Sequence, residues 1–218
     1  LQERRSAPPA DPGAPGREQL LRANEFAASW FRETWEDERG AVAREAAESR
    51  GIAPETAETF RLGYAPGAVR QRSDHFLSRI GTRSSSIAAA VAAGLVREPE
   101  DGRRYDTFRH RLIFPICDEF GRPIAFGGRI LDPEDQPKYL NSPESAVFNK
   151  SRTLYGLHLA RQPIMRERLA IVTEGYTDVI ACHQAGIEHV VGTLGTALTH
   201  DHARRLARLC DTVVLVFD

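Results

Sequence analysis

Residues 169–218 decide the fold, and they read LAIVTEGYTDVIACHQAGIEHVVGTLGTALTHDHARRLARLCDTVVLVFD. Apolar runs typical of buried parallel strands alternate there with segments typical of helices. The predicted order is strand 169–173, helix 176–185, strand 189–194, helix 199–209 and strand 212–217. Because strands and helices alternate, the segment is expected to form a parallel sheet with right-handed crossovers.

Two acidic residues directly follow strands of this predicted sheet. Glu174 closes the first strand and Asp218 closes the third, and Asp178 follows Glu174 by one helical turn. Because ligands of open parallel sheets bind at the carboxyl ends of the strands, we expect these carboxylates to share one edge. Clustered carboxylates stay ionised together most easily around a hard divalent cation. The alternative is the ordinary preference for acids near helix N-termini.

The preceding residues predict a different organisation, an α+β subdomain. Helices are expected from residue 17, at 40–50, from 54, at 73–80, at 84–93 and at 154–165, and a loop at 133–143. Residues 112–116 and 123–126 flank a turn and indicate a β-hairpin. Pro- and Gly-rich residues 1–16 are typical of a linker. We therefore predict three parts, namely 1–16, 17–166 and an α/β unit over 167–218.

Composition narrows the class of protein. The chain has 218 residues, 41% hydrophobic and 27% charged, with a net charge of −1. This is typical of globular proteins, and the bulk charge does not indicate nucleic acid. Three widely spaced cysteines without a CxxC pair predict neither a disulfide framework nor a zinc site, and they fit a reducing cytosol. No apolar run reaches the ~20 residues of a membrane span. Because the chain has no signal peptide and no initiator methionine, we expect a piece of a longer protein.

Basic side chains between residues 103 and 152 form a second group of candidates. Arg109 and Arg111 are expected on one side of an extended segment, because side chains alternate along a strand. Arg129 follows Gly127 and Gly128, where a phosphate backbone could come close. A solvated hairpin face remains the alternative reading of these charges.

Lysine usage is unusual, because only Lys138 and Lys150 among 29 basic residues are lysines. In a chain that otherwise uses arginine, a lysine is typical of a site that needs a compact point charge, with chance as the alternative. Lys138 precedes Tyr139 and Asn141, and a charge with a ring and an amide suits a single-stranded nucleic acid track.

Six blocks of sequence, in order, resemble the central RNA polymerase domain of bacterial DnaG-type DNA primases. The blocks are RHRLIFPI (109–116), GRPIAFGGR (121–129), PKYLNSPE (137–144), LYGL (154–157), EGYTDV (174–179) and TLGTA (193–197). The resemblance implies a basic mixed α/β subdomain followed by a Toprim domain. It also implies template-directed synthesis of short RNA primers on single-stranded DNA from ribonucleoside triphosphates. His110 and Thr177 depart from the family, where an acid and a methionine are more usual.

The same resemblance implies roles for individual residues. Glu174 and Asp218 are the expected catalytic acids and metal ligands, with Asp178 as a further metal candidate. The implied contacts to template or nucleotide are Arg129, Lys138, Asn141 and Lys150, and Arg109 and Arg111 join them from the charge pattern above.

Cofactors and partners follow as further expectations. Mg²⁺ or Mn²⁺ is implied as the cofactor, with single-stranded DNA, ribonucleoside triphosphates and an RNA primer–DNA hybrid as ligands. The family's zinc-binding and helicase-interacting domains are expected outside this chain, so zinc and the replicative helicase belong there. The implied location is the bacterial cytoplasm, at the replication fork and not at a membrane.

Two other functions remain open at this point. Toprim folds also occur in nucleases and topoisomerases, which cleave phosphodiesters with the same kind of carboxylates. A topoisomerase would need a tyrosine nucleophile on another domain. Alternatively, the chain binds single-stranded DNA and has no activity of its own, and we expect the isolated piece to be inactive or weak.

Overall fold

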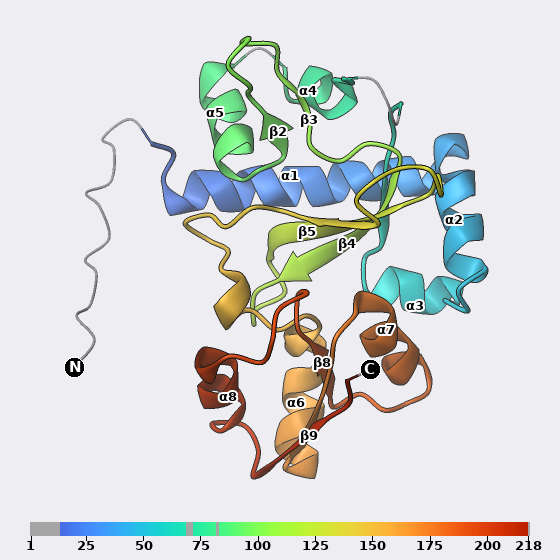
Figure 1. Ribbon diagram of the computed structural model, residues 1–218, viewed down its shortest axis with the longest axis vertical. Coiled ribbons are helices and arrows are strands. Elements are labelled where there is room, and N and C mark those ends of the chain that lie inside the picture. The colour runs from blue at the N-terminus through green and yellow to red at the C-terminus, as the bar shows by residue number, and fades with distance from the viewer. Residues whose placement is uncertain (1–13, 69–71, 82, 218) are drawn as a thin grey trace.

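Two sheets of opposite kind organise the protein, which the computed structural model describes over residues 14–68, 72–81 and 83–217 (Figure 1). An antiparallel sheet lies in the N-terminal part and a parallel sheet in the C-terminal part. This confirms the predicted fold class, α+β followed by α/β. Residues 1–13, most of the predicted linker, lie outside the described residues. No helix in the described ranges has the length and apolar character needed to cross a membrane.

The antiparallel sheet has four strands in the order β1-β4-β5-β6. They are β1 (Gly63–Ala65), β4 (Arg111–Cys117), β5 (Pro123–Ile130) and β6 (Tyr139–Asn141). β4 and β5 form the predicted hairpin. The prediction of a loop over 133–143 is wrong for β6, which pairs antiparallel with β5. A three-residue edge strand is too short to show a period of two, so the sequence pattern misses it.

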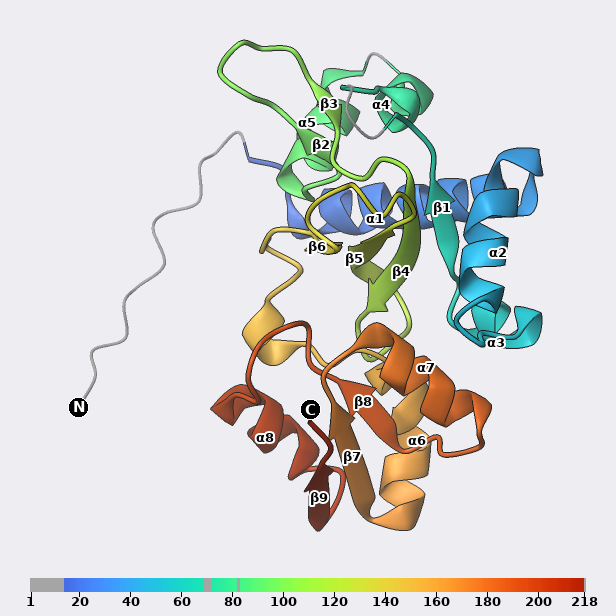
Figure 2. The same cartoon turned by 45° about the vertical axis from the view of Figure 1, so that its right-hand side comes forward.

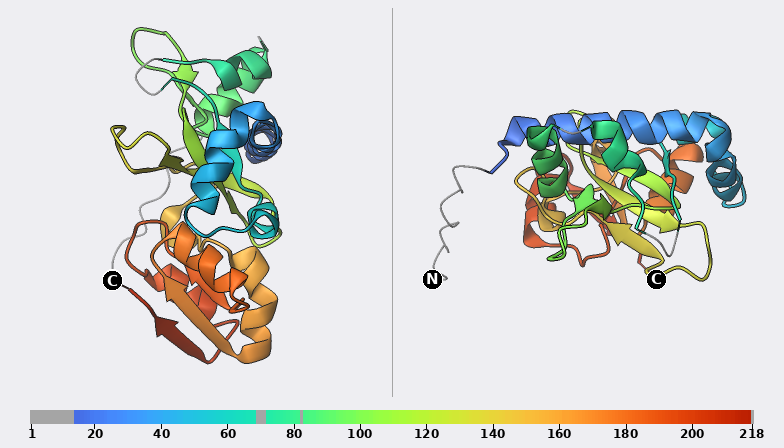
Figure 3. Two further views of the ribbon diagram at one scale, coloured as in Figure 1. Left: turned by 90° about the vertical axis from the view of Figure 1, so that its right-hand side faces the viewer. Right: turned by 90° about the horizontal axis from the view of Figure 1, so that it is seen from above.

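Helix α1 (Arg17–Glu36) runs across the antiparallel sheet, as Figure 3 shows. Its buried face includes Phe31, whose ring meets that of Phe126 on β5 edge-on, with 5.2 Å between centroids. Buried Asn24 donates from Nδ2 to the carbonyl oxygen of Ile124 at 3.0 Å. The helix is followed by η1 (Glu38–Gly40), α2 (Ala41–Glu48) and α3 (Pro54–Thr59). A predicted amphipathic helix thus covers the hairpin and closes its core.

A small lobe packs beside α1 and is held by a buried carboxylate. It contains α4 (His75–Ile80), α5 (Ser84–Ala92), β2 (Val96–Arg97) and β3 (Tyr105–Asp106). Asp106 is 1% exposed and accepts the backbone N–H groups of Phe76 at 2.8 Å and Leu77 at 3.0 Å. Burial nevertheless raises the pKa of Asp106 to about 6, because a carboxylate loses hydration there.

The stability of the protein is expected to fall as Asp106 ionises. Its pKa is about 6 in the fold against 3.8 ordinarily, so the folded state binds the proton more tightly than the unfolded state. As the pH rises from about 4 to about 6, the contribution of Asp106 to the free energy of unfolding should therefore fall by up to ~3 kcal/mol. Urea unfolding across this range should show a shallower decline in Asp106→Asn. Glu100→Gln, at an exposed position of the same lobe, is the matched control and should keep the wild-type slope. Equal slopes in all three proteins would contradict the prediction.

The parallel sheet has the strand order β8-β7-β9. Its elements are α6 (Leu157–Glu167), β7 (Leu169–Thr173), α7 (Tyr176–Gln184), β8 (Val190–Gly192), α8 (His200–Leu206) and β9 (Thr212–Leu215). Helix α6 packs on this sheet, since Leu157 and Ile164 share a buried cluster with Val172 and Val191. It does so although it precedes residue 167, and the domain boundary itself stays a prediction.

Candidate functional site

The carboxyl ends of β7 and β9 lie side by side at one edge of the parallel sheet. Val172 is paired with Leu215, and the Val216 N–H donates to the Val172 carbonyl oxygen at 2.9 Å. Glu174 therefore leaves β7 at the same edge where the chain leaves β9. Asp218, the second predicted catalytic acid, lies outside the described residues. Its approach to Glu174 stays a prediction.

Glu174 and Asp178 differ in how their carboxylates are used. Both residues are exposed. Asp178 Oδ2 accepts the Gly175 N–H at 3.0 Å and so caps the start of α7, while Glu174 has no hydrogen bond or ion pair with any residue that the structure describes. Residues 14–68, 72–81 and 83–217 contain no group of three His, Cys, Asp or Glu side chains arranged around a metal position. Of these two acids, Glu174 is therefore the one whose carboxylate is left available to a ligand.

Figure 2 shows the antiparallel sheet above the parallel sheet, and Asn141 ties β6 to the carboxyl edge of the parallel sheet. Its Nδ2 donates to the carbonyl oxygen of Leu194 at 3.1 Å, just beyond β8. Its Oδ1 accepts the hydroxyl of Tyr176 at 2.7 Å, where α7 begins. The antiparallel sheet thus presents β6 to the edge that carries Glu174. The predicted nucleotide contact of Asn141 stays a prediction, beside this bridging role.

Aromatic rings pack against the two glycines before Arg129. A Cβ at Gly127 would lie 2.4 Å from Cζ of Tyr176, and one at Gly128 would lie 2.7 Å from Cδ1 of Phe108. Both glycines are buried. The hypothesis that a phosphate backbone approaches them is therefore wrong, because protein rings already fill the space.

Arg129 itself is held against its cross-strand neighbour Tyr139. Its Nη1 donates to the Tyr139 hydroxyl at 2.6 Å, and its Cζ lies 5.1 Å from the centre of that ring. The Nε atom is buried and has no hydrogen-bond partner among the described residues. This buried atom is not accessible to an external phosphate, so the predicted phosphate contact of Arg129 would use its other N–H groups and stays a prediction.

The backbone from Arg109 to Arg111 is not extended as predicted, because His110 between them has a left-handed conformation with φ 48°. Arg111 is buried, and its guanidinium pairs with Asp135 at 2.8 Å and donates to the Pro137 carbonyl oxygen at 2.9 Å. Burial lowers the pKa of Arg111, while Asp135 opposes this. Arg111 thereby supports the loop before Lys138, and a contact with nucleic acid would require it to leave these partners.

Arg109 reaches the same neighbourhood by another route. Its Nη1 donates to the Asp106 carbonyl oxygen at 2.6 Å, and its Cζ lies 5.2 Å from the centre of the Tyr105 ring. Arg109 and Arg111 both line one cavity of about 190 Å³ that also includes Tyr105 and Thr107. The two arginines therefore share a cavity, although the predicted extended backbone between them is wrong.

Neither lysine takes part in the ion pairs of the described residues, all of which use arginine. Every ion pair in the described part of the chain has arginine as its cation, and two examples are Arg122 with Asp118 and Arg205 with Glu119. Lys138 is exposed and Lys150 is half-buried, and neither ammonium has a partner among the described residues. This is what the predicted compact charge for an external phosphate requires.

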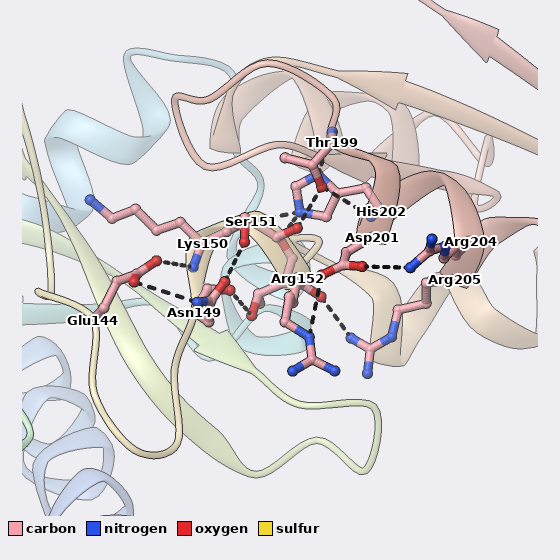
Figure 4. Close-up of polar contacts among 11 residues, drawn as sticks. Glu144, Asn149, Lys150, Ser151, Arg152, Thr199, Asp201, His202, Arg204 and Arg205 are labelled. Carbon is pink, nitrogen blue, oxygen red and sulfur yellow. Dashed lines mark hydrogen bonds and ion pairs between the residues drawn. The ribbon is translucent and has the colours of Figure 1, made fainter. Parts of the chain in front are cut away.

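The segment that carries Lys150 is η2 (Lys150–Arg152), and helix α8 holds it (Figure 4). His202 Nε2 lies 3.0 Å from the Lys150 carbonyl oxygen, and Thr199 Oγ1 donates to that of Ser151 at 2.5 Å. Neither His202 nor Arg205 stands out in the sequence. Their contacts join residues about 50 positions apart, and the only local signal is that Thr199 can cap a helix.

Comparison with known proteins places this geometry in one family. Residues 30–161 match the family described as DNA primase catalytic core, N-terminal domain, and residues 168–218 match the Toprim domain. A DNA primase from Halalkalibacterium halodurans is 43% identical over 203 residues, which are 92% of this chain and 33% of that protein. The chain thus spans about a third of the length of this curated relative.

Solved structures agree with the sequence match. The structure of a DnaG primase catalytic domain bound to single-stranded DNA has a TM-score of 0.84 and 38% identity, covering 91% of this chain and 63% of that one. A DNA primase domain from Pseudomonas aeruginosa has a TM-score of 0.84 and 41% identity, covering 90% and 60%. The match over 30–161 covers more than half of the chain, so the protein belongs to the DnaG-type DNA primase catalytic core family and its last part is a Toprim domain.

Proposed function

We propose that the whole protein synthesises short RNA primers on single-stranded DNA from ribonucleoside triphosphates. The observation that carries the proposal is one edge of the parallel sheet, where Glu174 is exposed and has no partner among the described residues, and where Tyr176 bonds to Asn141 of β6. Lys138 lies just before that strand and Lys150 lies on the segment held by α8. A carboxylate for a metal ion and cations for phosphate thus lie on elements that meet at this edge, and a relative of the same fold is described as bound to single-stranded DNA.

A divalent cation, Mg²⁺ or Mn²⁺, is the proposed cofactor. Glu174 and Asp218 would hold it, with Asp178 as a further ligand. The exposure of Glu174 fits this use, because Mg²⁺ binds through one or two carboxylates together with waters and substrate phosphates. The ion would supply charge stabilisation for the attacking and leaving oxygens of an in-line displacement.

The proposed reaction is nucleotidyl transfer. A 3′-hydroxyl oxygen bonds to the α-phosphorus of a ribonucleoside triphosphate, the bond to the bridging oxygen breaks, and pyrophosphate leaves. Glu174 either binds the metal ion or accepts the hydroxyl proton. Lys138, Lys150 and Arg129 neutralise phosphate charge and orient the template or nucleotide. The RNA primer–DNA hybrid, the replicative helicase and the cytoplasmic location belong to this proposal as well.

A primer-synthesis assay with the full-length protein tests the proposal. Single-stranded DNA, ribonucleoside triphosphates and Mg²⁺ should yield short RNA complementary to the template. Cleavage of the DNA without RNA product would favour the Toprim nuclease alternative. Binding of the DNA with neither product would favour the single-stranded DNA-binding alternative.

Lys138→Ala is expected to weaken binding of single-stranded DNA and to flatten its salt dependence. Each phosphate contact to a single strand contributes about 0.7 to the slope of log K against log salt concentration, so the slope should lose roughly that amount. Fluorescence anisotropy of a labelled oligothymidylate over a salt series measures it.

Arg208→Ala is the matched control for this experiment. Arg208→Ala removes one positive charge, as Lys138→Ala does. Arg208 is exposed after α8 and forms no ion pair within the described ranges, so no internal contact is lost. The control should keep the wild-type slope. If Lys138→Ala keeps it too, Lys138 does not contact the DNA backbone.

A further inference from the structure

Four consecutive carbonyl groups, those of residues 150–153, accept hydrogen bonds from one face of helix α8 (Figure 4). His202 Nε2 lies 3.0 Å from the oxygen of Lys150 and 3.1 Å from that of Thr153. Thr199 Oγ1 donates to Ser151 and Arg205 Nη1 to Arg152, at 2.5 and 3.1 Å. The three donors are spaced by three residues, so they share one side of the helix. Helix α8 therefore sets the position of this segment.

His202 makes these contacts as a neutral imidazole. Its Nδ1 accepts the backbone N–H of Thr199 at 3.3 Å, so the proton resides on Nε2 and is directed at the two carbonyl oxygens. The side chain is fully buried, and burial lowers its pKa from the ordinary 6.5. Loss of this donor would leave the buried carbonyl oxygen of Thr153 and the part-buried one of Lys150 without this partner, which is costly.

The main chain of Lys150 is fixed on both sides while its side chain stays free. The Lys150 N–H donates to Glu144 Oε1 at 3.1 Å, and its carbonyl oxygen faces His202. Figure 4 shows the side chain extending away from this network. A cation on a fixed backbone loses less conformational freedom when a phosphate binds, so the anchoring raises affinity without touching the ligand.

We propose that His202, assisted by Thr199 and Arg205, is a positioning residue for Lys150. It acts through the main chain of Lys150, and the group that Lys150 binds is a phosphate of the DNA template or of a ribonucleoside triphosphate. The inference rests on the proposed function, in which Lys150 binds phosphate. It adds the part of the protein that makes this contact effective.

A double-mutant cycle in the full-length protein tests the inference. Lys150→Ala, His202→Leu and the double variant are titrated with labelled oligothymidylate in one arm and with ATP and Mg²⁺ in the other. The arm in which Lys150→Ala weakens binding, by roughly 10-fold for one charged contact, identifies the source of the phosphate. In that arm His202→Leu should weaken binding about 5-fold in the presence of Lys150 and by less than about 1.5-fold in its absence.

Conservative variants keep the test independent of folding. His202→Gln retains a side-chain N–H that can donate to the segment and should recover most of the affinity. Arg205→Met removes the donor to Arg152 from a half-buried position and should weaken binding in the same Lys150-dependent way. Arg204→Met is the matched control, because Arg204 pairs with Asp201 and makes no contact with residues 149–153. Thermal unfolding should report folded protein for each variant that is titrated.

Three outcomes would contradict the positioning role of His202. Equal losses with and without Lys150 would overturn the positioning role and leave the proposed function intact, as would a His202→Leu protein that binds like wild type. Unchanged binding by Lys150→Ala in both arms would overturn both the phosphate contact of Lys150 and the positioning role that depends on it.

Discussion

Glu174→Gln in the full-length protein should reduce primer synthesis by at least about 100-fold, with single-stranded DNA binding within about twofold of wild type. Glutamine keeps the shape of the side chain and removes the charge that a metal ion or a transferred proton requires. The fold should be unaffected, because Glu174 is exposed and has no internal partner in the described part of the chain. Incorporation of labelled ribonucleotides and anisotropy of labelled DNA measure the two properties.

Glu188→Gln is the control for this charge change. Glu188 is exposed between α7 and β8, toward the opposite ends of the strands, and it should support wild-type synthesis. Comparable synthesis by Glu174→Gln and Glu188→Gln would remove Glu174 from the chemistry. A loss of synthesis together with DNA binding would instead indicate that Glu174 serves the template site.

Gly127→Ala is expected to destabilise the protein by ~3 kcal/mol, at the upper end of overpacking in a core. The added methyl group would lie 2.4 Å from Cζ of Tyr176, whose ring is buried and stacks on Phe114 with 5.0 Å between centroids. The ring cannot retreat without breaking its hydrogen bond to Asn141, so the join between the two sheets should weaken. Urea unfolding measures the loss.

Two further variants make the cause specific. Gly16→Ala is the control, because the nearest atom to its Cβ would be 3.8 Å away and the position is exposed. It should lower the free energy of unfolding by no more than about 1 kcal/mol, because Gly16 is the N-cap of α1 and glycine is preferred to alanine there. Tyr176→Leu removes the ring, so its loss and that of Gly127→Ala should combine less than additively. Strict additivity would show that the two side chains do not compete for one space.

The elements predicted from the sequence are those with a strong local pattern. Residues 169–172 are all apolar and a glycine turn follows soon after Thr173, so the strand and the helix after it could be placed from the sequence. The hairpin of β4 and β5 carries its own turn residues. The strand β6 could not be found this way, because only its pairing with β5 defines it.

The candidate site could be predicted in its residue types but less well in its geometry. The sequence points to Glu174 because it closes a strand and to both lysines because they are rare, and the structure leaves all three without partners in its described part. The predicted extended backbone from Arg109 to Arg111 is wrong, because His110 has a left-handed conformation. The prediction of a phosphate approach at Gly127 is wrong because the ring of Tyr176, from helix α7, fills the space, and no local pattern reports such tertiary packing.

Arginine is the cation in every ion pair of the described residues, and this has a chemical consequence for the lysines. Acylating agents transfer acetyl and other acyl groups to ε-amino groups and leave guanidinium groups unchanged. Within this chain only Lys138 and Lys150 offer side-chain amines as targets. Acylation of either would neutralise a cation that the proposed function assigns to phosphate, and it would spare the arginines that hold the fold. The susceptibility of this molecule to amine modification is thus concentrated where a charge change bears on template handling.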